Sequence, residues 1–179
     1  MKKPYTLILG SLMAIILGFS LLGIISKISE DSRIAQKESK LRAEISEVTE
    51  VDVTFADEIS HYSRYGFHGD GITCIAYHFS DNGPGNTIKN STVWNPFPLT
   101  DTLQMLVYGV VDDNLSVTPI IVDKDHKPLI PEIKEGYYFF IDRNANQQAD
   151  NFWEHSSTNF VLALYDAEAN NLYYCEFDT

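Results

Sequence analysis

The uncharged stretch of residues 4–26 constrains this chain more than any other feature of its sequence. It runs PYTLILGSLMAIILGFSLLGIIS, from Pro4 to Ser26, with no Asp, Glu, Lys or Arg. As a helix it would reach about 34 Å, which is enough to cross the ~30 Å hydrocarbon core of a bilayer. Because a backbone in hydrocarbon must satisfy its own hydrogen bonds, such a stretch has to be helical. The sequence therefore predicts an N-terminal leader and transmembrane anchor over residues 1–26.

A cleaved signal peptide is the alternative interpretation of this segment, because Lys2 and Lys3 form the basic N-terminal region that signal peptides have. The apolar region of a signal peptide is usually only ~7–15 residues long and ends in a small-x-small cleavage site. The loose match at residues 18–20 lies inside the apolar run, so a retained signal-anchor is favoured. We expect a single-pass protein of the cell membrane whose domain is extracytoplasmic, although basic residues after the span leave the opposite orientation open.

The charge of the chain after the span is strongly negative. All 25 acidic residues lie at or after Glu30, and all but two of the 13 basic residues lie at or after Lys27. An acidic domain is repelled by nucleic-acid phosphates and by anionic lipid headgroups. We therefore expect no nucleic-acid partner, contact with the membrane through residues 4–26 alone, and a protein or surface ligand as the partner of the domain.

Residues 27–50 carry a helical pattern. Ile34, Leu41 and Val48 are seven residues apart and Ile45 adds a further apolar position, whereas most residues between them are charged. This pattern predicts an amphipathic helix that serves as a stalk or linker. A coiled coil is less favoured, because Glu38 occupies a seam position.

Residues 51–179 have the pattern of one soluble, acidic, β-rich domain. Val51 to Phe55 alternates apolar and polar residues, and Tyr137–Ile141 is apolar on both faces, which is typical of a central strand. Further predicted elements are strands at 72–79, 159–165 and 172–177, the last two joined as a hairpin, and a strand at 117–122 that Pro119 interrupts. A helix is predicted at 99–108, with Thr100 as its N-cap and Gly109 as its stop. The segment 80–98 is predicted to be a loop whose Trp94 and Phe97 pack on the core. With no βαβ alternation, the sequence predicts an α+β fold with a mostly antiparallel sheet and little helix.

The two cysteines, Cys74 and Cys175, both fall in predicted strands. They could form a disulfide in an extracytoplasmic compartment if those two strands lie close together. The favoured interpretation is a pair of small buried apolar residues, because two cysteines make no framework and no CxxC motif occurs.

The first candidate site is the glycine-rich segment GFHGDG at residues 66–71. His68 and Asp70 could act as an acid–base pair or as metal ligands, and the glycines would let a ligand approach the backbone. The competing interpretation is a tight turn before the next strand, with both side chains bound to local amides. This structural interpretation is favoured, because no nucleophile accompanies the pair.

The second candidate site is the segment DRNANQQAD at residues 142–150. The oxygen-bearing side chains of Asp142, Asn144, Asn146 and Asp150 match the start of an EF-hand calcium loop. However, glutamine replaces the glycine required at position 6 and tryptophan replaces the bidentate glutamate at position 12. A polar loop is therefore favoured, and no cofactor is expected.

Aromatic residues are concentrated in the last strands of the domain. The group comprises Tyr137, Tyr138, Phe139, Phe140, Tyr165, Tyr173, Tyr174 and Phe177. One interpretation is an exposed tyrosine-rich binding face. The favoured alternative is aromatic pairing between neighbouring strands inside the sheet.

Four stretches carry a resemblance to a group of proteins. They are GFHGDG at 66–71, WNPFPLTDTLQMLVYG at 94–109, EGYYFFIDR at 135–143 and NFVLALYDAEANNLYYCEFDT at 159–179. With these stretches the chain resembles a group of small bacterial proteins that have an N-terminal membrane anchor and one acidic domain. The resemblance implies a bacterial origin and a coherent fold, and it carries over no catalytic residue.

Together these patterns favour a membrane-anchored, extracytoplasmic binding or accessory domain that is not an enzyme. The alternative is a metal-dependent or acid–base hydrolase centred on His68 and Asp70. The two functions differ in whether His68, Asp70, Asp142 and Asp150 converge in one site.

Overall fold

The computed structural model describes the backbone of most of the chain. The described residues are 5–66, 69–111, 116–144, 152–154 and 157–179, with the backbone alone for residues 5–25. The chain divides into two compact units, residues 1–44 and residues 45–179, and each is described by itself. The second unit begins inside the segment predicted as a stalk, because Ile45 and Thr49 are fully buried.

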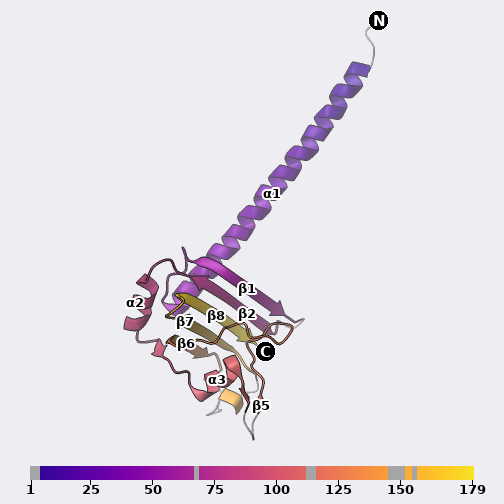
Figure 1. Cartoon of the computed structure of the whole chain (residues 1–179). Coiled ribbons are helices and arrows are strands. Elements are labelled where there is room, and N and C mark those ends of the chain that lie inside the picture. The colour runs from indigo at the N-terminus through magenta and orange to yellow at the C-terminus, as the bar shows by residue number, and fades with distance from the viewer. Residues whose placement is uncertain (1–4, 67–68, 112–115, 145–151, 155–156) are drawn as a thin grey trace. The chain divides into compact units, whose positions relative to one another are not determined.

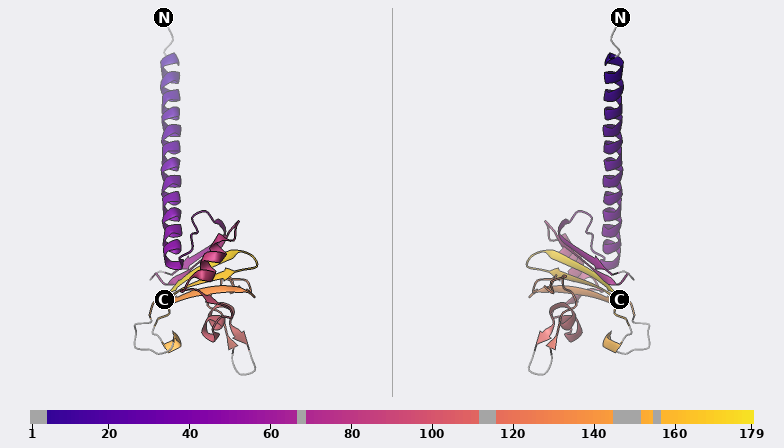
Figure 2. Two further views of the ribbon diagram at one scale, coloured as in Figure 1. Left: turned by 90° about the vertical axis from the view of Figure 1, so that its left-hand side faces the viewer. Right: turned by 90° about the vertical axis from the view of Figure 1, so that its right-hand side faces the viewer.

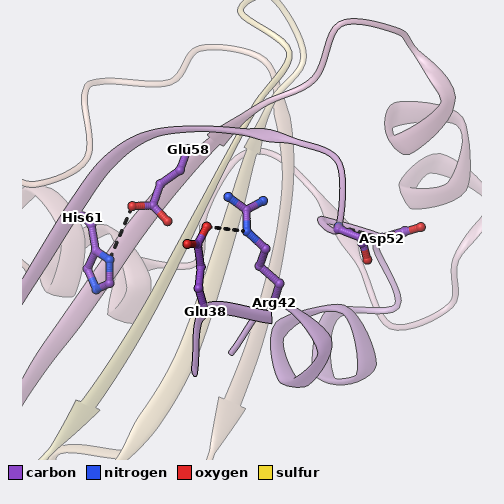
Figure 3. Close-up of polar contacts among 6 residues, drawn as sticks. Glu38, Arg42, Asp52, Glu58 and His61 are labelled. Atoms are coloured by element: carbon purple, nitrogen blue, oxygen red, sulfur yellow. Dashed lines mark hydrogen bonds and ion pairs between the residues drawn. The ribbon is translucent and has the colours of Figure 1, made fainter. Parts of the chain in front are cut away.

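A single helix, α1 (Tyr5–Thr49), begins the chain and confirms the predicted helix after residue 27. Ion pairs one turn apart join Lys40 to Glu44 and Arg42 to Glu38 along its surface. Figure 3 shows the pair of Arg42 and Glu38. The helix stops at Glu50, whose φ of 59° lies in the left-handed region. Within the residues whose side chains are described, no helix has both the length and the apolar character needed to cross a membrane.

A six-stranded antiparallel sheet forms the centre of the second unit (Figure 1). Its strands are β1 (Asp57–Tyr65), β2 (Gly71–His78), β3 (Asn95–Pro96), β6 (Gly136–Asp142), β7 (Phe160–Asp166) and β8 (Asn171–Asp178). Their order in space is β1-β2-β8-β7-β6-β3, and β4 (Val110–Val111) pairs with β5 (Ser116–Val117) in a separate ribbon. The predicted antiparallel α+β fold and the predicted hairpin of the last two strands are confirmed.

The helices of the second unit are short. They are α2 (Gly83–Asn90), α3 (Asp101–Tyr108) and the 3₁₀ turn η1 (Phe152–Glu154). Helix α3 was predicted from its ends, and the structure confirms both: the Thr100 hydroxyl accepts a hydrogen bond from the Leu103 amide, and Gly109 follows the last turn with φ 70°.

One face of the sheet packs on α3 and on the segment that follows it (Figure 2). Alternate strand residues supply this layer: Ile72, Cys74, Ala76, Phe160, Leu162, Leu164, Tyr173 and Cys175. Leu103, Leu106, Ile121 and Ile130 cover them, and all four side chains are at most 2% exposed. The largest apolar layer of the unit therefore lies between the sheet and α3.

The second face of the sheet is also covered. Ile75, Tyr77, Val161, Ala163, Leu172 and Tyr174 alternate with the first set and are all buried. On this side Trp94 packs against Phe139, with ring centroids 5.7 Å apart, and its Nε1 donates to the Thr49 carbonyl oxygen at 2.8 Å. Because both faces are covered, the central strands are apolar throughout and lack alternation.

The strand predicted at Val51–Phe55 is wrong, since these residues form no strand. Asp52 accepts a hydrogen bond from the Thr54 amide at 2.8 Å, which closes a local turn in place of a ladder. The two valines are buried, whereas Phe55 is 93% exposed. The apolar alternation therefore reflects two anchoring side chains, and the first strand begins at Asp57.

Three further predictions need correction. The predicted loop at 80–98 contains α2, which begins with Pro84 in its first turn and with the Asp81 carboxylate accepting from the Gly83 amide. Of the strand predicted at 117–122, only Val117 lies in a strand, because Pro119 interrupts it. Strand β6 was expected to be central, but its outer neighbour is only the two-residue β3.

The favoured interpretation of the cysteines as free residues is also wrong. Cys74 and Cys175 are bonded to each other, and they are directly opposite in the register of β2 and β8. Sequence alone could not place β2 beside β8, because 101 positions separate the two cysteines. Their pairing joins β2 and β8, two neighbouring inner strands of the sheet.

Candidate functional site

The two candidate segments predicted from sequence lie at the same end of the sheet. Asp70 immediately precedes β2, and Asp142 is the last residue of β6. The ladder explains this placement, because the register joins Gly71 to Asp178 on β8 and Phe177 in turn to Phe160 on β7. His68, Asn146 and Asp150 lie outside the described residues.

Asp70 lines a cleft of about 380 Å³ beside the C-terminal end of the chain. Arg64, Tyr65, Ile72, Phe177 and Asp178 contribute to the same cleft. The turn that carries Asp70 is closed by a hydrogen bond from the Gly66 amide to the Asp70 carbonyl oxygen at 2.7 Å. Gly69 takes φ 92°, which a residue with a side chain rarely adopts. The glycines of this segment therefore serve the tight turn, and the Asp70 carboxylate remains exposed.

Asp142 and Asn144 are engaged within their own loop. The Asp142 carboxylate accepts from the Asn144 amide at 2.8 Å. Asn144, only 6% exposed, donates from Nδ2 to the Ser157 carbonyl oxygen at 2.8 Å. Between them in sequence, Arg143 forms an ion pair with Glu176 of β8. In the described residues these side chains fix the loop after β6 to the chain before β7.

The structure separates Asp70 from Asp142. Strands β8 and β7 lie between β2 and β6, so the two residues are three strand spacings apart, or about 14 Å. Ligands of one metal ion lie within ~2.6 Å of it, which this distance does not allow. Across the described part of the chain, no three His, Cys, Asp or Glu side chains are placed to hold a metal ion together.

A second cleft, of about 400 Å³, was not predicted from the sequence. It lies where β3, β6 and α3 approach one another, and Phe97, Leu99, Tyr108, Ile133 and Tyr137 form its apolar wall. Gln104, Lys134 and Glu135 add polar groups. Ligand sites of this volume typically combine apolar and aromatic walls with a few polar groups.

Tyr108 fixes one wall of this cleft. Its hydroxyl donates to the Pro131 carbonyl oxygen at 2.9 Å and accepts from the Ile133 amide at 3.2 Å. Burial raises the pKa of Tyr108 above its usual value, because the neutral phenol is favoured away from water. The phenol therefore stays neutral at physiological pH and holds the chain at residues 131–133 in place.

Sequence reasoning missed this cleft because its lining comes from three separate segments. Residues 96–98 lie in the predicted loop, 99 lies directly before α3, 104 and 108 lie on α3, and 133–137 lead into β6. No sequence motif or periodicity relates residues that are this far apart in the chain. The available signal was the WNPFP segment, whose Trp94 and Phe97 were expected to pack on the core; Trp94 is buried and Phe97 is half-buried.

A third cleft, of about 310 Å³, is lined by the turn at Asp52, by Phe79 and by the start of α2. Hydrogen bonds from the side chain and then the amide of Thr54 lower the pKa of the Asp52 carboxyl. Figure 3 shows Asp52 on its turn, at a distance from the Glu58–His61 pair of β1. The side chain therefore stays ionised and serves the turn.

The aromatic residues of the last strands mostly face the interior. Phe139, Tyr165, Tyr173 and Tyr174 are buried. Phe140, Phe152, Phe160 and Phe177 form a connected set of rings with centroids 5.4–6.0 Å apart. Aromatic packing inside the sheet is thus the arrangement observed, and Tyr137 is the member of the predicted group that lines the cleft beside α3.

Comparisons of the chain with protein-family models, with curated proteins and with solved structures give no match.

Proposed function

We propose that this chain is a membrane-anchored binding domain that acts on the extracytoplasmic side of a bacterial cell membrane. In this proposal residues 4–26 cross the bilayer and residues 45–179 bind a partner outside it. The strong negative charge after residue 26 favours a domain that stands away from anionic lipid.

The observation that carries the proposal is the disulfide between Cys74 and Cys175. Structural disulfides persist in oxidising compartments and are rare in the reducing cytosol. An anchor followed by a disulfide-bonded domain is therefore consistent with the orientation that places the domain outside. In that compartment the domain would meet other extracytoplasmic proteins. We therefore propose that its partner is one of these proteins.

The binding site proposed for that partner is the cleft beside α3. Its walls include Phe97, Tyr108 and Tyr137, and aromatic residues are enriched at protein-binding surfaces. Lys134 and Glu135 supply one charge of each sign, so the cleft suits an uncharged segment of chain. We propose that the occupant is an extended peptide segment of a protein partner that inserts an apolar side chain between the two tyrosines.

The test is photo-crosslinking in intact bacterial cells that produce the full chain. p-Benzoylphenylalanine replaces Tyr137 in the cleft or, as the matched control, the exposed Lys124 away from it. We expect a protein adduct from position 137 and none from position 124. A protease added outside spheroplasts should digest the domain.

Two results of that experiment would contradict the proposal. The first is an equal yield of adducts from positions 137 and 124, which would show that the cleft has no preferred occupant. The second is a domain that resists external protease until the membrane is broken, which would place it on the cytoplasmic side.

A hydrolase centred on His68 and Asp70 is the second candidate function. The observation that favours it is the exposed Asp70 carboxylate in a cleft that also contains Arg64 and Asp178. The two functions differ at Asp70, because the binding proposal does not use it. Asp70→Asn should leave the adduct yield from position 137 unchanged, whereas a hydrolase would lose its activity.

A further inference from the structure

Strand β1 is one of the two edge strands of the sheet, and its side chains are exposed on both faces. Of its nine residues only Tyr62 is half-buried. The pairing with β2 supplies its contacts within the ladder, and its outer edge has no neighbour among the described strands. A long exposed edge of this kind is a template for the addition of another strand.

The register shows which backbone groups of β1 point outward. The Cα atoms of Cys74 and Cys175 are only 4.1 Å apart, the spacing of a non-hydrogen-bonded pair. The amide and carbonyl of Cys74 therefore turn toward β1, where Tyr62 is directly opposite. Because these directions alternate along a strand, the backbone groups of His61 and Ser63 point away from the sheet.

Two residues of opposite charge on β1, Asp57 and Arg64, are placed symmetrically about His61. His61 is opposite Ile75 of β2, Arg64 is opposite Ile72 and Asp57 is opposite His78, so Arg64 and Asp57 each lie three β2 positions from the centre. The remaining charged residue, Glu58, lies two positions from the centre and pairs with His61 of its own strand. The register shift between Glu58 and Ser60 makes this symmetry possible by taking up one extra residue of β1. The same alternation puts Asp57 and Arg64 on one face of the strand, and within the described residues neither forms an ion pair.

We propose that two copies of this chain associate through antiparallel pairing of their β1 strands, with His61 at the two-fold axis. In this register the two His61 residues exchange both backbone hydrogen bonds. Each Arg64 is directly opposite the partner's Asp57, which gives two opposite-charge pairs. A symmetric dimer requires a self-complementary patch, and this register provides one in both backbone and charge.

This register is the one that the charges favour. Moving the axis by one residue, to Tyr62, would bring Arg64 opposite the partner's Ser60 and would lose both ion pairs. Charged residues and bulges on an edge strand usually prevent pairing. In β1 the register shift and the positions of Asp57 and Arg64 allow one symmetric pairing with two opposite-charge pairs. Copies anchored in one membrane would also meet at a high effective concentration, which favours a small interface.

The test is cysteine crosslinking of the full chain reconstituted in lipid vesicles. His61→Cys places a thiol at the axis, and Lys89→Cys on α2 is the control at another exposed position. Mild oxidation should give a covalent dimer with His61→Cys and none with Lys89→Cys. Equal yields from the two positions would overturn the proposal, because they would reflect collisions in the membrane.

Charge reversal of Arg64 or Asp57, in the chain that carries His61→Cys, tests the proposed register. Arg64→Asp or Asp57→Arg alone should lower the dimer yield by roughly tenfold, because two opposite-charge pairs become like-charge pairs. The two changes together should restore it. A yield that is unaffected by the single changes, or that the double change does not restore, would contradict this pairing; both residues are exposed, so each variant is expected to fold. The outcome does not depend on the occupant of the cleft beside α3.

Discussion

Strands β1 and β7 belong to the same antiparallel sheet but differ strongly in the burial of their side chains. In β7 every residue from Phe160 to Tyr165 is buried, since Leu162 and Leu164 face α3 while Val161 and Ala163 face the opposite layer. In β1 eight of nine residues are exposed. The two strands share a backbone conformation and differ in whether anything covers their faces.

Because of this difference, β7 contributes strongly to the stability of the fold, whereas β1 is exposed to a partner. Burying a large apolar side chain contributes about 1.5–3 kcal/mol, so β7 contributes to the free energy of folding through both faces. A ladder hydrogen bond contributes only about 0.5–1.5 kcal/mol net, and β1 has little more than its ladder. The fold therefore does not depend on β1 to the same extent, and β1 is available to a partner.

The largest effect is expected from the disulfide that joins β2 to β8, between these two regions. Replacing both Cys74 and Cys175 by alanine removes a crosslink across 101 positions of chain. Loop-closure entropy assigns about 4.7 kcal/mol to a loop of this size. We expect a loss of this order in the free energy of unfolding, measured by urea titration of the full chain in detergent micelles. An unchanged midpoint would show that the covered faces of β7 and β8 hold the sheet without the crosslink.

A smaller effect should follow from truncating single side chains on the two strands. Leu162→Ala on β7 leaves a cavity between the sheet and α3 and should cost about 2–5 kcal/mol. Ile59→Ala on β1, where the side chain is 52% exposed, should cost no more than about 0.5 kcal/mol. Both values come from the same urea titration. If the two variants lost similar stability, the contrast between the strands would be wrong.

The parts of the fold that were predicted from the sequence are those where burial or capping leaves a local pattern. The β7–β8 hairpin was recognised because its strands are continuously apolar and Asp166 begins the turn between them. Helix α3 was recognised from Thr100 and Gly109 at its ends. Strand β1 was missed for the opposite reason: DEISHYSRY has no apolar face, because no layer covers it.

Long-range pairing explains the other failures. The disulfide depends on β2 and β8 being neighbours, and nothing local to either cysteine indicates that. The cleft beside α3 likewise gathers Phe97, Tyr108 and Tyr137 from separate segments. Of the predicted site residues, Asp70 does line a cleft, but the sequence could not show that two strands separate it from Asp142.

The most direct test of the contrast between β1 and β7 is amide hydrogen exchange, measured residue by residue on the full chain carrying Arg64→Asp, which prevents the proposed pairing. The amides of β7 should exchange only through unfolding of the whole domain. Along β1 the amide of Tyr62 should be protected by β2, whereas those of His61 and Ser63 should exchange almost freely. Uniform protection of β1 at the level of β7 would contradict the account, because it would show that the edge strand is closed within the single chain.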